Sequence, residues 1–255
     1  MRTLFLRFYE ELNDFLPPER RKIEFRHTID RNASVKDVIE SLGVPHTEVE
    51  LILVNGESVD FSYCVQHNDR ISVYPLFESL DISPLLRLRD KPLRTPRFVL
   101  DSNLGRLARY LRLLGFDCLY RNDYSDAEVA EIASRQQRIV LTRDRTLLRR
   151  KIITHGYFVR AVLPREQVKE VMKRFDLYRA VVPFSRCIRC NGPLSDVDKD
   201  QIVERLEPLT QKHYHDFKMC GNCGQIYWQG SHQHRARLLL EEFTNPDADV
   251  IQAGK

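Results

Sequence analysis

Long apolar segments are absent from this chain of 255 residues. No run of about 18 apolar residues occurs, so the sequence offers no transmembrane helix and we expect no membrane partner. Glu10 and Glu11 follow the first residue too closely for the apolar core of a secretory signal. Charged residues make up 30% of the chain, which is typical of a globular protein in water. We therefore expect a cytoplasmic protein.

Cysteine is scarce, with six residues, and four of the six stand in two CxxC pairs separated by 29 residues. The paired residues are Cys187, Cys190, Cys220 and Cys223. Disulfides are rare in the cytosol, so this pattern indicates a structural zinc site with four thiolate ligands. The alternatives are two unrelated reduced pairs or a redox motif. Turns follow both pairs, one ending at Gly224, and we expect backbone amides there to point at the sulfurs. The other two cysteines, Cys64 and Cys118, are expected to be inert core thiols.

Acidic residues are scarce in the second part of the chain. Residues 1–80 carry 9 Lys and Arg against 14 Asp and Glu, a net charge of −5, whereas residues 81–255 carry 31 against 22, a net of +9. This asymmetry favours separate domains with different partners. The basic part points weakly to ligands rich in phosphate.

Residues 1–80 read as a small α+β domain. The expected strands are 3–9, 23–29, 50–54, 57–61 and 71–74, with a helix over 35–42. Ser34 and Asp37 form a capping box in front of the helix, Gly43 ends it, and Asn55 with Gly56 indicates a tight hairpin. This order resembles the β-grasp fold of ubiquitin-like sulfur carriers. Those carriers end in a reactive diglycine, which is absent after Pro75, so we expect a module that binds a protein partner.

A basic linker with three prolines is expected over residues 81–96, and a domain of alternating strands and helices over 97–183. The expected strands are 98–100, 116–120, 138–141 and 157–163. Helices are expected over 104–114, 126–134, 145–150 and 165–175. Short strands that alternate with helices predict an α/β domain with a parallel sheet and helices on both faces.

Carboxylates follow three of these strands. They are Asp101, Asp123 with Asp126, and Asp144. The carboxyl ends of parallel strands lie at one edge of a sheet, where open α/β folds bind ligands. Acids that meet there repel each other unless a hard divalent cation neutralises them, and Mg²⁺ or Mn²⁺ can then activate water for phosphodiester hydrolysis.

Each acid also has a purely structural interpretation. Asp101, Asp126 and Asp144 precede helices and can act as N-caps, and Ser125 with Glu128 is a capping box of its own. A phosphoryl-transfer enzyme with an Asp nucleophile wants a second acid two residues after the first, where this chain has Asn103. The absence of this second acid argues against a phosphoryl-transfer enzyme.

Arginines surround the expected acidic cleft. Arg106, Arg109 and Arg112 recur at intervals of three along one helix, and a second group surrounds Asp144. The second group contains Arg143, Arg145 and Arg149. Such residues can hold the phosphates on either side of a scissile bond. The alternative is a solvated helix face with local salt bridges.

Three stretches together resemble the Mut-seven C-terminal RNase family of PIN-like nucleases, which end in a four-cysteine zinc ribbon. They read RFVLDSNLGRLARYLRLLGFD at 97–117, SDAE at 125–128 and LTRDR at 141–145. The resemblance covers about residues 97–243, and many bacterial members carry a β-grasp domain without diglycine ahead of it. It implies that Asp101, Asp126 and Asp144 bind the metal, with Asp123 as a less certain fourth acid. Asn103 departs from the Met that many members have there. PIN-like domains commonly dimerise, so a homodimer is compatible with the resemblance.

Residues 184–243 are expected to form the zinc ribbon and a terminal helix, with a polar tail over 244–255. In the ribbon, Tyr227 and Trp228 can stack on bases while Arg235 binds phosphate, or the aromatic pair can serve packing alone. Together with the resemblance, the sequence predicts a ribonuclease dependent on Mg²⁺ or Mn²⁺. It leaves the identity of the RNA open, and tRNA or another structured RNA is compatible with it. The competing hypothesis is a non-catalytic adaptor for RNA or the ribosome, in which the acids are only helix caps.

Overall fold

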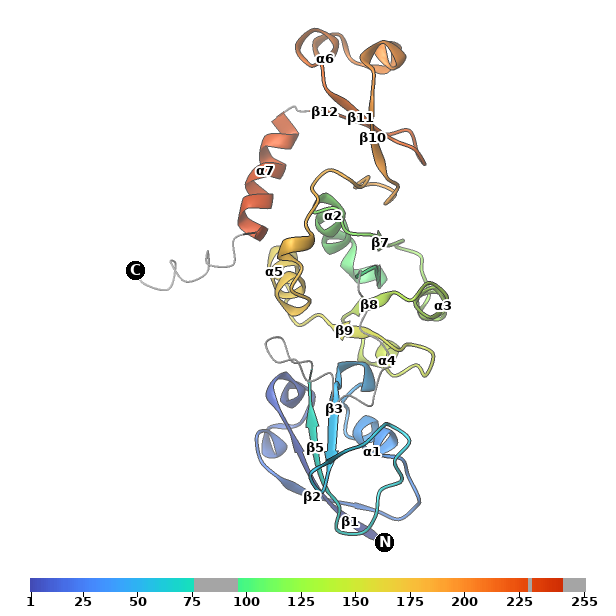
Figure 1. The fold of residues 1–255 in the computed structure, drawn as a ribbon, viewed down its shortest axis with the longest axis vertical. Coiled ribbons are helices and arrows are strands. Elements are labelled where there is room, and N and C mark those ends of the chain that lie inside the picture. The colour runs from blue at the N-terminus through green and yellow to red at the C-terminus, as the bar shows by residue number, and fades with distance from the viewer. Residues whose placement is uncertain (76–95, 229–230, 245–255) are drawn as a thin grey trace, which may run out of the picture. The chain divides into compact units, whose positions relative to one another are not determined.

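The computed structural model describes residues 1–75, 96–228 and 231–244, and for 231–237 it describes the backbone alone (Figure 1). The linker predicted over 81–96 therefore lies outside the described residues except for Pro96, and the tail except for Thr244. Described residues fall into two compact units. One contains Met1–Thr95, of which 76–95 lie outside the description, and Asp126–Phe158; the other contains Pro96–Ser125 and Val159–Lys255, as far as it is described.

The first unit begins with a five-stranded sheet in the order β2-β1-β5-β3-β4. Its strands are β1 (Arg2–Phe8), β2 (Phe25–Ile29), β3 (Leu51–Val54), β4 (Glu57–Ser58) and β5 (Arg70–Tyr74). The central pair β1 and β5 is parallel, and the other neighbours are antiparallel. Helix α1 (Val35–Ser41) buries Val35, Val38 and Ile39 in the core formed with the sheet. This is the predicted β-grasp fold.

Local signals in this domain act as expected. The Ser34 Oγ accepts a hydrogen bond from the Asp37 amide at 3.1 Å, and Asp37 Oδ2 accepts one from the Ser34 amide at 3.3 Å, which completes the capping box. Asn55 and Gly56 have φ values of 53° and 90°, the left-handed conformations that a tight hairpin between β3 and β4 requires.

Strands and helices alternate from residue 98 to residue 174. The elements are β6 (Phe98–Leu100), α2 (Gly105–Leu113), β7 (Cys118–Leu119), α3 (Asp126–Gln136), β8 (Ile139–Thr142), α4 (Arg145–Leu148), β9 (Gly156–Phe158) and α5 (Pro164–Arg174). Within one unit β6 pairs with β7, and within the other β8 pairs with β9; both pairs are parallel. The predicted α/β class with a parallel sheet is confirmed.

The strand predicted over 157–163 is shorter in the structure, because β9 ends at Phe158. Glu170 on α5 explains the difference. Its carboxylate accepts hydrogen bonds from the amides of Arg160 and Ala161, both at 2.8 Å, so these two amides bind a side chain in place of a neighbouring strand.

The cysteine-rich segment folds around a three-stranded antiparallel sheet in the order β10-β11-β12. Its elements are β10 (Leu194–Val197), α6 (Pro208–His213), β11 (Phe217–Cys220) and β12 (Ile226–Trp228). A small core of Ile202, Leu206, Phe217 and Ile226 supports it.

The last helix, α7 (Ser231–Thr244), packs against the helices of its own unit. The Phe243 ring lies 5.3 Å from the Tyr110 ring of α2, and Glu242 pairs with Arg165 of α5 at 3.1 Å. Among the described residues, none of the helices is both long and apolar enough to cross a membrane.

Candidate nuclease site and metal centre

Asp101 follows β6 directly and is 6% exposed. Its backbone begins the short 3₁₀ helix Ser102–Leu104, yet its side chain makes no capping hydrogen bond there. The Ser102 hydroxyl donates to Asp101 Oδ1 at 3.1 Å. Because a carboxylate is costly to bury, its place at a strand end without a capping role favours a functional interpretation over the N-cap interpretation.

Asp126 and Asp144 belong to the other unit, and both are half-buried. Asp126 is the first residue of α3. Asp144 lies two residues after β8 and caps α4, because its Oδ1 accepts the Thr146 amide at 2.7 Å. The structure thus confirms that each of these acids follows a strand, as the sequence predicts. Their convergence with Asp101 on a metal ion stays a prediction.

Asp123 is fully exposed and forms an ion pair with Arg121, whose Nη2 lies 2.5 Å from Asp123 Oδ2. The hydrogen bond from Arg121 lowers the pKa of Asp123 below its ordinary value. These contacts are those of a surface ion pair, and they give Asp123 a weaker claim to the metal than Asp101 has.

A pocket of about 460 Å³ opens next to Asp101, along the residues that follow it. Two of the predicted RNA-binding residues, Arg106 and Arg109, line this pocket, and no Asp or Glu is among its lining residues. Within the described part of the chain, neither guanidinium has a partner. Tyr120 closes one side, where its hydroxyl donates to the Ser102 carbonyl at 2.9 Å and a Cβ on Gly105 would lie 2.5 Å from the Tyr120 hydroxyl. The pocket can therefore attract an anion beside Asp101.

Arg112, expected on the same basic face, is instead turned inward and 3% exposed. Its guanidinium donates to the carbonyl of Cys118 at 2.8 Å and to those of Ile188 and Arg189 at 3.1 and 3.0 Å. The expectation of a common exposed face is thus wrong for this residue. The spacing along the helix does not reveal the carbonyls of Ile188 and Arg189, which the fold brings within reach of this long side chain.

The arginines around Asp144 differ in their surroundings. Arg143 is exposed in the loop after β8. Arg145 packs its guanidinium over the rings of Phe15 and Phe158 and donates to the Asp14 carbonyl at 3.4 Å. Arg149 ends α4 and reaches the turn after α1, where a Cβ on Gly43 would lie 3.7 Å from its Nη2. The contacts of Arg145 indicate a structural role, and RNA binding by these three residues stays a prediction.

Four cysteine sulfurs gather between the two CxxC turns. The Sγ atoms of Cys187, Cys190, Cys220 and Cys223 all lie within 4.8 Å of one another. Cys187 and Cys223 are separated by 3.6 Å, and Cys190 and Cys220 by 3.4 Å. A tetrahedral zinc site with Zn–S bonds of about 2.3 Å places its sulfurs roughly 3.8 Å apart. The four thiols can therefore hold a metal such as zinc. Among the described residues this is the one such group of three or more Cys, His, Asp or Glu.

Backbone amides of the first CxxC turn point at its sulfurs, as predicted, and for the second turn this expectation stays a prediction. The Cys190 amide donates to Cys187 Sγ at 3.4 Å, and the Gly192 amide donates to Cys190 Sγ at 3.5 Å. The intervening Asn191 takes a positive φ of 70° and ties the turn to the α/β domain. Its side-chain Nδ2 donates to Asp117 Oδ1 at 2.8 Å, and its side-chain Oδ1 accepts the Cys118 amide at 2.9 Å.

Tyr227 is a residue of the cluster that the cysteine spacing did not reveal. Its hydroxyl lies 3.1 Å from Cys187 Sγ. Burial raises the pKa of the Cys187 thiol, but the Tyr227 hydroxyl and the amides of Cys190 and Arg189 outweigh it and bring the pKa down to about 7. Burial raises the pKa of Cys190 to about 12. Stacking of Tyr227 on a base competes with this contact, so Trp228 is the better candidate for stacking.

The remaining predictions for the cysteines and for the RNA-binding residues of the ribbon are partly confirmed. Cys118 is fully buried, as expected of a core thiol, whereas Cys64 is exposed, because it lies in the loop between β4 and β5. The expectation of a buried Cys64 is therefore wrong. Trp228 is 36% exposed at the end of β12. The side chain of Arg235 lies outside the described residues.

Comparison with known proteins gives two family matches. The Mut7-C RNAse domain matches residues 96–240, and the Mut7-C ubiquitin domain matches residues 1–81. No curated protein matches the chain. The crystal structure of SAMP1 from Haloferax volcanii matches with 17% identity and a TM-score of 0.24, over 29% of this chain and 96% of that one. Since the RNAse match spans more than half of its residues, the chain belongs to the Mut7-C RNAse domain family, with a Mut7-C ubiquitin domain ahead of it.

Proposed function

We propose that this protein is a metal-dependent ribonuclease whose acidic site is formed by Asp101, Asp126 and Asp144. Membership of the RNAse domain family supports the reaction class. The observation that carries the proposal furthest is the basic pocket that opens beside the buried Asp101. A nuclease needs cationic groups next to its metal ligands, because the phosphates that flank the scissile bond must be held there.

The roles follow from the chemistry of the side chains. Carboxylates are the oxygen ligands that Mg²⁺ and Mn²⁺ prefer, so the three acids would hold one or two such ions. A bound ion lowers the pKa of water and stabilises charge on the phosphate oxygens. Arg106 and Arg109 would hold the RNA backbone in the pocket. The four cysteines would hold a structural zinc ion that fixes both CxxC turns.

The substrate and partners form part of the proposal. Structured RNA such as tRNA is the proposed substrate, and the cytoplasm is the proposed site of action. The β-grasp domain is proposed to bind a protein partner, because the chain continues with Leu76 and Phe77 after Pro75 where a carrier would have its diglycine.

A cleavage assay tests this function. Total cellular RNA and labelled tRNA are incubated with the zinc-loaded full chain in Mg²⁺, in Mn²⁺ and without either ion, beside Asp101→Asn. Cleavage that needs the ion and is lost in the variant supports the proposal. Asp30→Asn is the matched control, since Asp30 is an exposed acid of the other domain. RNA binding without cleavage in every condition would contradict it.

One observation favours the adaptor as a second candidate. The carboxylate of Asp144 already accepts the Thr146 amide, as a simple helix cap does. An adaptor would bind RNA equally well without Mg²⁺ or Mn²⁺, and Asp101→Asn would leave its affinity for RNA unchanged. The assay above therefore separates the two functions.

A further inference from the structure

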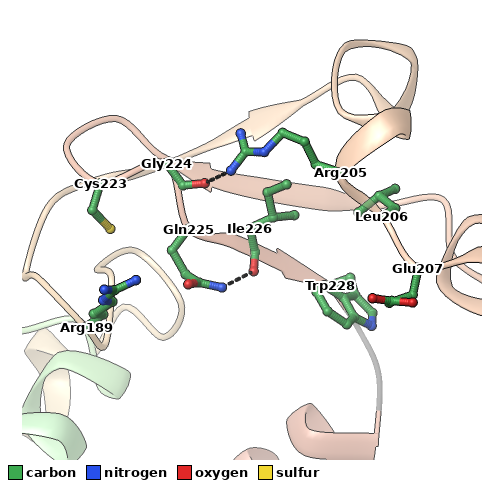
Figure 2. Close-up of a pocket in the computed structure, with 9 residues that line it drawn as sticks. All are labelled: Arg189, Arg205, Leu206, Glu207, Cys223, Gly224, Gln225, Ile226 and Trp228. Carbon is green, nitrogen blue, oxygen red and sulfur yellow. Dashed lines mark hydrogen bonds between the residues drawn. The ribbon is translucent and has the colours of Figure 1, made fainter.

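A second pocket lies in the cysteine-rich domain and has a volume of about 300 Å³ (Figure 2). Both CxxC turns contribute to its lining, through Arg189 from the first and through Cys223 and Gly224 from the second. Trp228 and Glu207 line it as well. This volume lies in the range of small-ligand sites.

Trp228 and Tyr227 have opposite roles because successive residues of a strand point to opposite faces. Tyr227 turns toward Cys187, whereas Trp228 turns into the pocket. Trp228 stands at the end of β12, an outer strand of its sheet. Within the described residues its indole N–H has no partner, and the side chain lines the pocket and is 36% exposed.

The backbone around the pocket is held in place. Arg205 Nη2 donates to the Gly224 carbonyl at 2.6 Å, which fixes the second turn. Arg112 of α2 donates to the Arg189 carbonyl at 3.0 Å, which fixes the first. The Arg189 side chain itself is exposed, and in the described part of the chain its guanidinium has no partner. The pocket thus presents two cations, Arg205, which is held on the Gly224 carbonyl, and Arg189, whose guanidinium has no partner in the described part of the chain.

The polar groups divide the pocket into two ends. Figure 2 draws Arg189 on the side of Cys223 and Glu207 on the side of Trp228. A phosphate is attracted by Arg189 and repelled by Glu207. A base stacked on Trp228 lies instead within reach of an acceptor, and a carboxylate accepts hydrogen bonds from exocyclic amino groups. An indole at one end and a free guanidinium at the other supply the stacking surface and the positive charge that sites for single-stranded nucleic acid combine.

We propose that this pocket binds one nucleotide of single-stranded RNA, with its base stacked on Trp228 and its phosphate on Arg189. Glu207 favours bases with an exocyclic amino group, such as cytosine, over uracil. The choice of RNA as the polymer rests on the proposed ribonuclease function. The site would then hold an unpaired part of the substrate while the acidic site cuts elsewhere.

Fluorescence offers a direct test because Trp228 is the single tryptophan of the chain. The zinc-loaded full chain, without Mg²⁺ or Mn²⁺ to avoid cleavage, is titrated with oligo(C) and oligo(U) of eight nucleotides. We expect oligo(C) to quench the emission and to bind roughly threefold or more tightly than oligo(U). Glu207→Gln should remove this preference.

Variants are compared by the anisotropy of labelled oligo(C). Trp228→Ala should weaken binding about tenfold, whereas Trp228→Phe should retain most of it because a ring is still present. Arg189→Ala should weaken binding and reduce its dependence on salt. Arg179→Ala is the matched control, an exposed arginine of the same unit outside the pocket, and should bind normally. An unchanged zinc content shows that each variant keeps its fold.

The outcomes separate this site from the nuclease. Cleavage of RNA with no quenching and normal binding by Trp228→Ala would overturn the proposed pocket and leave the ribonuclease intact. Quenching by oligo(C) with no cleavage in Mg²⁺ or Mn²⁺ would support the pocket and overturn the nuclease.

Discussion

The guanidinium of Arg145 lies over the ring of Phe158, 5.3 Å from its centre. The Phe15 ring of the β-grasp domain lies on the same guanidinium at 4.9 Å, and the two rings meet edge to face at 5.6 Å. Nearby, Glu48, which is 1% exposed, accepts the Phe158 amide at 2.5 Å. These contacts join the β-grasp domain to β9 and α4, whose cap is Asp144.

Arg145→Ala should lower the melting temperature, because a cation that packs on two aromatic rings contributes about 1–2 kcal/mol to the free energy of unfolding. Arg150→Ala, at an exposed arginine just beyond α4, should change the free energy of unfolding by less than about 0.5 kcal/mol. Thermal unfolding followed by circular dichroism measures both. If Arg145→Ala melts like the parent but loses affinity for RNA, this arginine is a substrate contact and the two aromatic contacts contribute little.

Asp144→Asn should abolish cleavage and leave the melting temperature nearly unchanged. Asparagine caps helices about as well as aspartate, so the Thr146 amide keeps its acceptor while the charge needed for a metal ligand is gone. Asp144→Ala should also lose roughly 1 kcal/mol of stability. Initial cleavage rates and melting curves are measured on the same preparations. Normal cleavage by Asp144→Asn would show that this carboxylate is a cap and nothing more.

The capping box of α1 should make the stability of the β-grasp domain depend on pH. The hydrogen bond from Ser34 lowers the pKa of Asp37 below its ordinary value of 3.8, although burial opposes this, and Lys151 and Arg31 act in the same direction as Ser34. A carboxylate whose pKa is lowered in the folded state contributes to the free energy of unfolding. This contribution is complete above the pKa of the group in the unfolded chain and disappears as the pH falls through its pKa in the folded protein.

Asp37→Asn should therefore reduce stability at pH 7 by about 0.5–1 kcal/mol, in the range of helix N-terminal carboxylates. The difference in the free energy of unfolding between Asp37→Asn and the parent should become smaller as the pH falls below about 4. Urea unfolding at several pH values measures it, with Asp30→Asn as the control without a cap. A difference between Asp37→Asn and the parent that is independent of pH would contradict the role of the ionised carboxylate.

Cys220→Ala should reduce bound zinc from about one ion per chain to none, because three thiolates leave the tetrahedral site incomplete. Cys64→Ala should keep the metal, since Cys64 lies outside the cluster of four. Metal content by mass spectrometry after dialysis gives the result. Full zinc occupancy in Cys220→Ala would show that these sulfurs do not form one site.

Signals that act over a few residues were readable from the sequence. Ser34 with Asp37 begins a helix, Asn55 with Gly56 makes a hairpin, and both depend on hydrogen bonds and φ angles within four residues. The first CxxC turn is equally local, since the amides of Cys190 and Gly192 donate to the sulfurs of Cys187 and Cys190. The position of Asp144 after β8 was predicted for the same reason, because a strand with three successive apolar residues is visible in the sequence.

Strand alternation along β12 predicts part of the arrangement of Tyr227 and Trp228. In a strand, Tyr227 and Trp228 must face opposite ways, so only one of the two can be open to a ligand. Which of them faces the cysteines was not readable, because the partner Cys187 lies 40 residues away in the chain.

The sequence alone determined the order of the three modules, the parallel α/β class and the set of four cysteines, since these depend on periodicity, turns and spacing within short windows. Only the tertiary structure decided that Arg112 holds the first CxxC turn, that Glu170 ends β9 early and that Arg145 packs on two rings. The physical reason is common to all three. A long polar side chain binds whichever backbone group or ring the fold brings to it, and Arg112 and Arg189 are 77 positions apart.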